Sequence, residues 1–428
     1  MNLARRNAHF LEVEVFWAAF LGAAATFGAA FALRLGASNQ EIGLLSSLPA
    51  LLALLITIPS GHFLSRRAQV MPWITGSLLI YRLGFLVVAL VPWLPIAAKG
   101  SVLVWVIVAF TLPAHFFGVG WNSMLADVIP EVDRSRVFAI RNGLSAVALT
   151  AGIYLCGIWL ESSPFPQNYQ VMFGVGVATS LISIYYIIKI KIPEPLHPPA
   201  PRDASTSGSS WQGVREMFSQ TGKMRSHPDF MRIVVNTLVH GMGLWMIAPL
   251  YVLYFVRSMG AGEGWLGING MLGNLTPVVG YYVWQKAIER WGENWALKWS
   301  IVLVGVYPVL VGMSPNLTVI LVWTALYGLL VPGVGLSHFP MLLKVCPDED
   351  RPFYMGVYTT IMNVGASIMP LIGVFLADRF GIVPVLIAGG LLCIAGSASF
   401  VFNPLRTEDS LSIRRSQAEE RSMARVAA

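Results

Sequence analysis

The chain has 428 residues, of which 55% are hydrophobic and 12% charged, and its formal net charge is +7. With a mean hydropathy of +0.64, it is too apolar for an ordinary soluble enzyme and is predicted to be an all-α polytopic membrane protein. The positive charges are scattered, which argues against nucleic-acid binding because that needs a concentrated basic face. The three cysteines, Cys156, Cys346 and Cys393, have neither metal-ligand spacing nor a disulfide pattern.

Six apolar runs fill the first part of the chain, and each can cross the roughly 30 Å hydrocarbon core, which takes about twenty residues. Arg5 and Arg6 precede the first run as in a signal peptide, but that run is longer than a typical signal segment and predicts a retained helix. The predicted helices are 12–34, 41–64, 70–94, 101–125, 137–160 and 170–190.

A polar stretch, "IPEPLHPPAPRDASTSGSS", follows these runs, and its Pro-rich and Ser-rich composition predicts a linker. Just after it, Trp211, Val214 and Phe218 recur at helical spacing, which predicts a short helix on the membrane surface. Six further helices are predicted at 229–256, 264–288, 295–313, 317–343, 353–377 and 382–403. The expected segments are a six-helix bundle over 1–193, a linker over 194–227, a second bundle over 228–403 and a tail over 404–428.

Lys and Arg residues fall mainly on alternate loops. If the N-terminus is inside, 24 of the 29 lie in inside segments, and Arg82 lies within a helix. The residues left outside are Arg34, Lys99, Arg257 and Arg379. Because cytoplasmic loops retain positive charge, we expect an integral protein of a bacterial plasma membrane with both termini in the cytoplasm.

The loops after the fourth helix of each half resemble one another: "ADVIPEVDRSRVFAIRNG" at 126–143 and "LKVCPDEDRPFYMGVYTT" at 343–360. The matching residues are Pro130, Asp133 and Arg134 in the first and Pro347, Asp350 and Arg351 in the second. Two six-helix halves with the same sidedness would form a parallel repeat about an axis along the membrane normal.

Over about residues 10–403 the chain resembles the major facilitator superfamily of secondary transporters. The family's loop motif G-x-x-x-D-R-x-G-R-[RK] stands here as "GHFLSRRAQV", in which Ser65 replaces the aspartate. A second copy, "QKAIERWGEN", has Gln285 in place of the first glycine, and the first charged loop fits the family segment D-x-x-P-x-x-x-R-x-R. The matching residues are Gly61 and Arg66, then Glu289, Arg290 and Gly292, then Asp127, Pro130, Arg134 and Arg136.

The resemblance implies that these loop charges form breakable pairs at the cytoplasmic helix ends and hold the outward-facing state. Asp127 is then the expected partner of Arg66, and Glu289 that of Lys344, which occupies the place of Asp127 in the second half. The alternative is that the charges are solvated and only set the topology. The candidate gating residues are Arg66, Asp127, Arg134, Arg136, Glu289, Arg290, Lys344 and Arg351.

Polar residues within the predicted helices are candidates for a binding site, because polar groups are costly in hydrocarbon. At 1.5 Å per residue, Arg82, His115 and His240 lie roughly 18 Å from the cytoplasmic helix ends, near the midplane where such transporters bind substrate. The resemblance implies a cavity lined by the first, fourth, seventh and tenth helices. For each histidine a structural role is equally open. The candidate cavity residues are Arg82, His115, Asn122, Asn236, His240, Asn274, Tyr327, His338, Asn363 and Trp17.

Proton coupling favours carboxylates and histidines, and the carboxylates considered for it are Glu12 and Glu14, expected at the cytoplasmic end of the first helix. No acidic residue is expected at the midplane. The fifth helix, "NGLSAVALTAGIYLCG", lacks the Gly-Pro pair of the family's drug-proton antiporters, which counts against that subgroup.

The predicted function is therefore secondary active transport of a small solute by alternating access, with proton coupling left open. We expect no enzymatic activity, no cofactor and no metal, and a monomer whose partners are the solute and the lipid bilayer. The alternative is a non-transporting relative that acts as a membrane scaffold, receptor or assembly factor.

Overall fold

The computed structural model describes residues 3–67, 69–191, 227–347 and 351–402. The surface helix predicted around Trp211 and the tail lie outside the described residues. The helices of the first half are α1 (Leu3–Ala25), α2 (Gly28–Arg34), α3 (Asn39–Ser65), α4 (Met71–Leu90) with a 3-10 turn at Val91–Trp93, α5 (Lys99–Val128), α6 (Glu131–Ser162) and α7 (Gln167–Ile188). Those of the second are α10 (Pro228–Leu253) with a π-helical turn at Tyr254–Ser258, α11 (Glu263–Met313), α12 (Leu317–Val345), α13 (Arg351–Phe380) and α14 (Ile382–Phe402).

Twelve crossings result from eleven long apolar helical segments in the described residues. α1 and α2 form one crossing that is broken at Thr26 and Phe27. α11 forms two: its 51 residues would span about 76 Å at 1.5 Å per residue, more than twice the hydrocarbon core. Gly292 divides it with φ 82°, a backbone conformation open to glycine. The predicted pair 264–288 and 295–313 is thereby confirmed.

Local sequence signals fix several helix ends. Ser38 caps α3 by accepting the backbone N–H of Glu41, and the Glu41 carboxylate accepts the backbone N–H of Ser38 at 2.7 Å. Asn316 caps α12 through the backbone N–H of Val319 at 3.0 Å. These caps lie at one end of the bundle and set the positions where α3 and α12 enter it.

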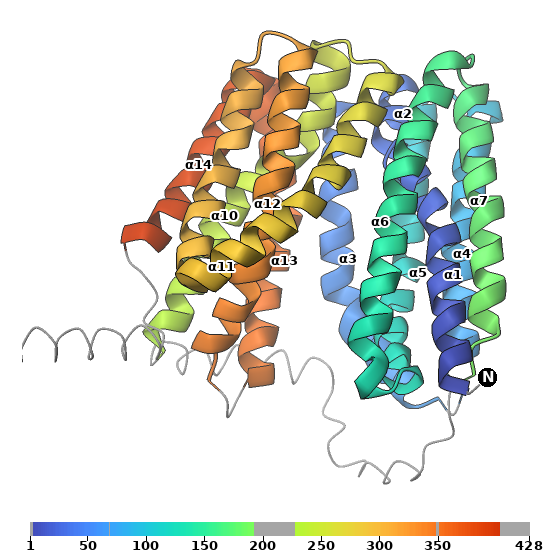
Figure 1. The fold of residues 1–428 in the computed structure, drawn as a ribbon. Helices are drawn as coiled ribbons and strands as arrows, with labels where there is room; N and C mark the ends of the chain where they lie inside the picture. Colours follow the sequence, from blue (N-terminus) through green and yellow to red (C-terminus); the bar gives the residue numbers. More distant parts are fainter. Residues whose placement is uncertain (1–2, 68, 192–226, 348–350, 403–428) are drawn as a thin grey trace, which may run out of the picture.

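The helices form two bundles that pack side by side (Figure 1). Within the first half α1 packs against α6 and α7, and α4 against α5 and α7; within the second, α10 packs against α13 and α14, and α11 against α12 and α14. The halves meet where α6 packs on α11 and α3 on α13. Small residues permit this contact: a Cβ on Gly157 would lie 2.7 Å from the Cα of Gly267.

Two ends of the bundle are distinguished below. The proximal end carries the N-terminus, the α3–α4 and α5–α6 connections and the break in α11, whereas the distal end carries the α2–α3, α6–α7 and α10–α11 connections (Figure 1). Between them the perimeter is apolar: Leu55, Ile188, Val278 and Phe375 are all exposed. This belt suits a hydrocarbon environment and confirms an integral membrane protein.

Candidate functional site

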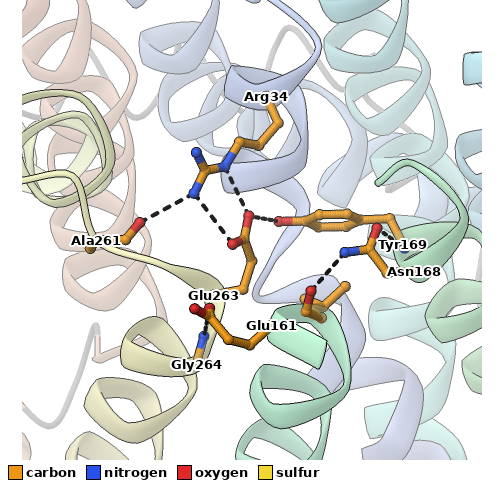
Figure 2. A network of polar contacts seen from close by, with 8 residues as sticks. Arg34, Glu161, Asn168, Tyr169, Ala261, Glu263 and Gly264 are labelled. Atoms are coloured by element: carbon orange, nitrogen blue, oxygen red, sulfur yellow. Dashed lines mark hydrogen bonds and ion pairs between the residues drawn. The ribbon is translucent and has the colours of Figure 1, made fainter. Parts of the chain in front are cut away.

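A cluster of polar contacts joins the two halves at the distal end and is called the distal latch (Arg34, Glu161, Tyr169, Glu263 and Gly264). Arg34 donates from Nε to Glu263 Oε1 at 2.8 Å and from Nη2 to Oε2 at 3.3 Å. The Tyr169 hydroxyl donates to the same carboxylate at 3.1 Å. Figure 2 shows the guanidinium and the phenol approaching this carboxylate from two elements of the first half. Such charge-assisted, two-pronged contacts are among the stronger hydrogen bonds in proteins.

The latch is built on helix ends. Glu263 is the first residue of α11, where the helix dipole favours a negative charge, and Arg34 is the last residue of α2, where it favours a positive one. Glu161 accepts the backbone N–H of Gly264 at 2.9 Å, so a second carboxylate binds the same helix terminus. A Cβ on Gly262 would lie 2.6 Å from a Glu161 carboxylate oxygen, so a larger residue there would require the Glu161 carboxylate to shift.

A second distal cluster, the Asn39 cluster (Ala37, Asn39, Arg257 and Asp378), lies nearby. The Asn39 amide donates to Asp378 Oδ1 at 2.6 Å, and Arg257 donates to Asn39 Oδ1 and to the backbone carbonyl of Ala37. The start of α3 is thus bound to the end of α13 and to the turn after α10. Together the two clusters close the distal end with side chains from both halves.

A cavity of about 330 Å³, the central cavity, lies between the halves. Apolar side chains dominate its lining, and its polar side chains are Thr26, Ser46, Tyr251 and Asn269. A second cavity of about 300 Å³ shares Thr26 and Ser46 with it and extends into the first half as far as Thr111. Cavities of this size, mostly apolar with a few polar groups, are typical of small-molecule sites.

One polar group of the central cavity is held in place by the second half. Asn269 Oδ1 accepts the hydroxyl of Thr324 at 2.7 Å, and the Thr324 oxygen lies 3.1 Å from the hydroxyl oxygen of Tyr307. This chain of contacts runs from α11 to α12 and back. The amide of Asn269 is therefore held in a fixed orientation at the cavity wall.

None of the candidate cavity residues predicted from the sequence lines the central cavity or the second cavity. The central cavity draws its lining from the break between α1 and α2, and from α2, α3, α6, α10 with its π-helical turn, and α11. These elements belong to the first, second, fifth, seventh and eighth crossings. Of the first, fourth, seventh and tenth helices that the resemblance implied, the first and the seventh contribute to this lining, and the fourth lines the second cavity.

Arg82 belongs to a charged network inside the first half. Its guanidinium donates to the backbone carbonyl of Ser180 and, at 3.0 Å, to the hydroxyl of Ser183. Ser183 donates in turn to Glu14 Oε2 at 2.8 Å, and Arg141 donates to Glu14 Oε1 at 2.6 Å. Glu14 is 2% exposed and Arg82 5%. The network joins α1, α4, α6 and α7 and satisfies buried charges that would otherwise be costly.

Glu14 lies further along its helix than the sequence indicated. α1 begins at Leu3 rather than near residue 12, so Glu14 lies about eleven residues, or roughly 16 Å, into the helix. Its carboxylate shares Ser183 with Arg82, at the level where no acidic residue was expected. Glu14 is therefore linked to Arg82 through the Ser183 hydroxyl. Glu12, in contrast, is half-buried.

Two predicted histidines lie in the interior of the second half. His240 Nδ1 lies 2.8 Å from the Ser397 hydroxyl oxygen and 3.1 Å from the Cys393 carbonyl, both on α14. His338 Nε2 lies 2.8 Å from the Thr237 hydroxyl oxygen on α10. Both side chains have hydrogen-bonding partners within their own half, which supports the structural role left open for them. Near them Asn236 is buried, and its Nδ2 has no hydrogen-bond partner in the described residues.

The remaining candidate cavity residues make local contacts or are open to solvent. Asn274 donates to the Gly270 carbonyl of its own helix at 2.8 Å, and the backbone carbonyl of Asn363 accepts the Ser367 hydroxyl at 2.6 Å. The ring centroid of Tyr327 lies 4.4 Å from that of Tyr307, and the ring centroid of Trp17 lies 5.6 Å from that of Phe16. His115 is half-buried and Asn122 is exposed.

At the proximal end the predicted charge pairs are only partly described. Arg66 and Arg136 are exposed, and the side chain of Asp127 lies outside the described residues. Lys344 Nζ lies 3.1 Å from Glu293 Oε2, so Glu293 occupies the place expected for Glu289. The chain turns at Gly292, which brings the next helix toward the end of α12.

The other candidate gating residues have nearby partners or are exposed. Glu289 accepts the Gln285 amide at 3.1 Å, and Arg290 lies over the Trp291 ring at 5.1 Å. Arg134 is half-buried and donates to the Ile129 carbonyl at 3.4 Å, and Arg351 is exposed at the start of α13.

Sequence reasoning missed the distal clusters because it treated their charges as exceptions to the topology rule. A usable signal exists: Arg34 and Glu161 follow helices of the first half, and Arg257, Glu263 and Asp378 lie at the same end of the second. Opposite charges at one end of two halves are able to pair when that end closes.

Comparisons with known proteins follow the architecture. The sequence pattern of the Major Facilitator Superfamily matches residues 15–235 and 233–425. Multidrug resistance protein MdtG of Proteus mirabilis (strain HI4320) is 28% identical over 183 residues, which cover 40% of this chain and 45% of that protein. An uncharacterized MFS-type transporter of Mycobacterium tuberculosis (strain ATCC 25618 / H37Rv) is 28% identical, covering 42% of this chain and 25% of its own. The matched stretch thus spans less than half of these curated relatives.

Solved structures share the fold at low sequence identity. A mutant of the nucleoside transporter NupG superposes with a TM-score of 0.70 at 11% identity, covering 92% of this chain and 99% of that one. A bacterial homolog of the human lysosomal transporter Spinster, inward-facing and unoccupied, superposes with a TM-score of 0.63 at 12% identity, covering 94% and 95%. These likenesses establish the fold alone.

Proposed function

The chain belongs to the major facilitator superfamily, and from this membership we propose that it is a secondary active transporter that moves a small uncharged solute across the membrane by alternating access. The observation that carries the proposal is the central cavity, which lies between the two halves rather than within one. A site at this position can be exposed to one side and then the other when the halves rock.

The lining of the central cavity supports an uncharged, partly apolar solute. Its polar side chains are hydroxyls and one amide, and its lining includes no Asp, Glu, Lys, Arg or His among the described residues. A charged solute would lose its hydration there without gaining a partner. The name of the relative MdtG, a multidrug resistance protein, fits an apolar-lined site, although the missing Gly-Pro pair separates this chain from typical drug antiporters.

We assign the proximal end to the cytoplasm on the loop charges, which places the distal latch outside. The structure then represents a state closed to the outside. Transport would require the distal latch and the Asn39 cluster to break as the proximal end closes, so that the central cavity opens outward. The proximal charges, including Lys344 and Glu293, are the candidates to hold that second state.

We propose Glu14 as the proton-coupling group. It is a buried carboxylate deep in the first half, and such groups within membrane helices are functional candidates by default. Protonation would remove the charge that binds Arg141 and so loosen α1 from α6. Because α1 leads directly to Thr26 at the central cavity, this change would reach the solute site along one crossing.

Reconstitution into liposomes tests the proposal. With a pH gradient imposed, uncharged solutes are screened for accumulation and for counterflow. Ser46→Leu fills part of the central cavity and should abolish both, whereas Thr57→Leu, an exposed site on the same helix, should leave them intact. A solute that binds without counterflow in the unaltered protein would favour the scaffold alternative.

A further inference from the structure

An apolar groove of about 640 Å³ lies between α3, α4 and α5, on the first half alone. Its lining includes Ile56, Phe63, Trp73, Ile80 and Leu112. The hydroxyl of Ser77, also in the lining, donates to the Ile74 carbonyl of its own helix at 2.9 Å and so offers little to a ligand. The groove therefore suits a hydrocarbon ligand.

The groove opens to the outer surface of the bundle. Trp73 is 44% exposed, Ile80 54% and Leu112 42%. None of its lining residues lines the central cavity. In a membrane protein this surface faces the lipid, so the chemistry that meets it is that of an acyl chain.

A fixed positive charge lies at the proximal end of the groove. The guanidinium carbon of Arg67 is 4.4 Å from the ring centroid of Phe63 and 5.1 Å from that of Trp73, and both rings line the groove. Arg66 beside it is exposed. An arginine stacked on aromatic rings keeps N–H donors that can bind phosphate.

We propose that this groove is a binding site for one anionic phospholipid from the leaflet at the proximal end. One acyl chain would lie along the groove between α3, α4 and α5, and the phosphate would bind Arg66 and Arg67. Basic pockets between helices at the cytoplasmic face recognise anionic headgroups in this way. The proposal does not need transport activity, so it can fail or hold independently of the proposed function.

Native mass spectrometry of the full chain tests the headgroup contact. Purified in detergent and titrated with phosphatidylglycerol or phosphatidylcholine, the protein should retain one phosphatidylglycerol preferentially. Arg66→Gln and Arg67→Gln should each weaken that retention about fivefold. Arg290→Gln is the matched control, because Arg290 also lies over a tryptophan at the proximal end, 5.1 Å from the ring of Trp291. Equal retention of the two lipids, or an equal loss in the control, overturns the proposal.

A second variant tests the chain-binding groove. A Cβ on Gly76, which lines the groove, would meet no atom within 4 Å, so Gly76→Leu can fold and fill the groove. It should abolish preferential retention, whereas Gly174→Leu on α7, where a Cβ also meets nothing within 4 Å, should not. Phosphatidylglycerol with a brominated acyl chain should quench the tryptophan fluorescence of the protein. Trp73→Phe should remove that quenched component. Undiminished retention of phosphatidylglycerol by Gly76→Leu counts against the proposal. So does a dimer in which a second copy of the chain takes the place of the lipid in the groove.

Discussion

Arg34 and Glu263 form an ion pair of 2.8 Å that joins the last residue of α2 to the first residue of α11. The two residues belong to different halves, and Tyr169 donates to the same carboxylate. A contact of this kind exists only while the distal end is closed. It therefore contributes to the free-energy difference between the closed state and one open to the outside.

Arg34→Gln should shift the population toward the state open at the distal end. An ion pair with one exposed partner and one largely buried partner contributes about 1–2 kcal/mol, which corresponds to a factor of about 5–30 in the equilibrium. The measurement is the labelling rate of a cysteine placed at Ser46 in the central cavity, with the native cysteines removed and an impermeant reagent added from the distal side. Faster labelling is expected.

The control for Arg34→Gln is Arg232→Gln. Arg232 pairs with Asp229 at 3.0 Å within α10, so its loss removes an ion pair without touching the contact between halves. The exchange Arg34→Glu with Glu263→Arg should restore slow labelling in part. If Arg34→Gln and Arg232→Gln are labelled at the same rate, the distal latch does not set the equilibrium between the closed and the open distal end.

Gly157→Ala should open the same end by a steric route. The new Cβ would lie 2.7 Å from the Cα of Gly267, and such overpacking costs about 1–3 kcal/mol. Gly143→Ala on the same helix is the control, because its Cβ would meet nothing within 4 Å. Faster distal labelling is expected for Gly157→Ala, with no change for Gly143→Ala. Equal labelling rates for the two variants would mean that the contact between α6 and α11 accommodates the added methyl group without destabilising the closed state.

Glu14→Gln should lower the stability of the first half. Removing one member of a buried ion pair leaves the Arg141 charge uncompensated and costs about 3–5 kcal/mol. The measurement is the midpoint of thermal unfolding in detergent. The double variant Glu14→Leu with Arg141→Leu should recover much of the loss, because it removes both charges. A double variant no more stable than Glu14→Gln would locate the effect in packing.

The coupling role of Glu14 has a separate readout. In liposomes Glu14→Gln should keep counterflow of the solute but lose accumulation driven by a pH gradient. Glu12→Gln, half-buried on the same helix, should retain both. Retained accumulation in Glu14→Gln would exclude Glu14 as the coupling group while leaving alternating access untouched.

Sequence alone predicted the twelve crossings, because each apolar run is long enough to span the membrane and the runs are separated by polar or glycine-containing segments. It could not place Glu14, since the depth of a residue depends on where its helix begins, and α1 continues into a polar stretch before the apolar run. Polar residues within the apolar runs are visible in the sequence. Their partners are not, because Ser183 and Glu14 are far apart in the chain and meet only through packing.

The partner of Lys344 was misassigned for a similar reason. Motif alignment favours Glu289, but a single glycine with positive φ redirects the chain before Glu293. The central cavity was beyond sequence reasoning because its lining comes from five crossings that meet only through packing. None of its four polar side chains, Thr26, Ser46, Tyr251 and Asn269, is among the candidate cavity residues.

The break at Thr26 and Phe27 gives the first crossing the form of a two-part lever. Its lower arm, α1, carries Glu14, its upper arm, α2, ends at Arg34, and the joint between them lines the central cavity. If the chain bends at this point, the contacts between the solute and the break would depend on the angle between α1 and α2. The lining of the cavity, the buried charge of Glu14 and the ion pair of Arg34 thus all lie on one continuous stretch of backbone, so a movement at any of them can reach the other two.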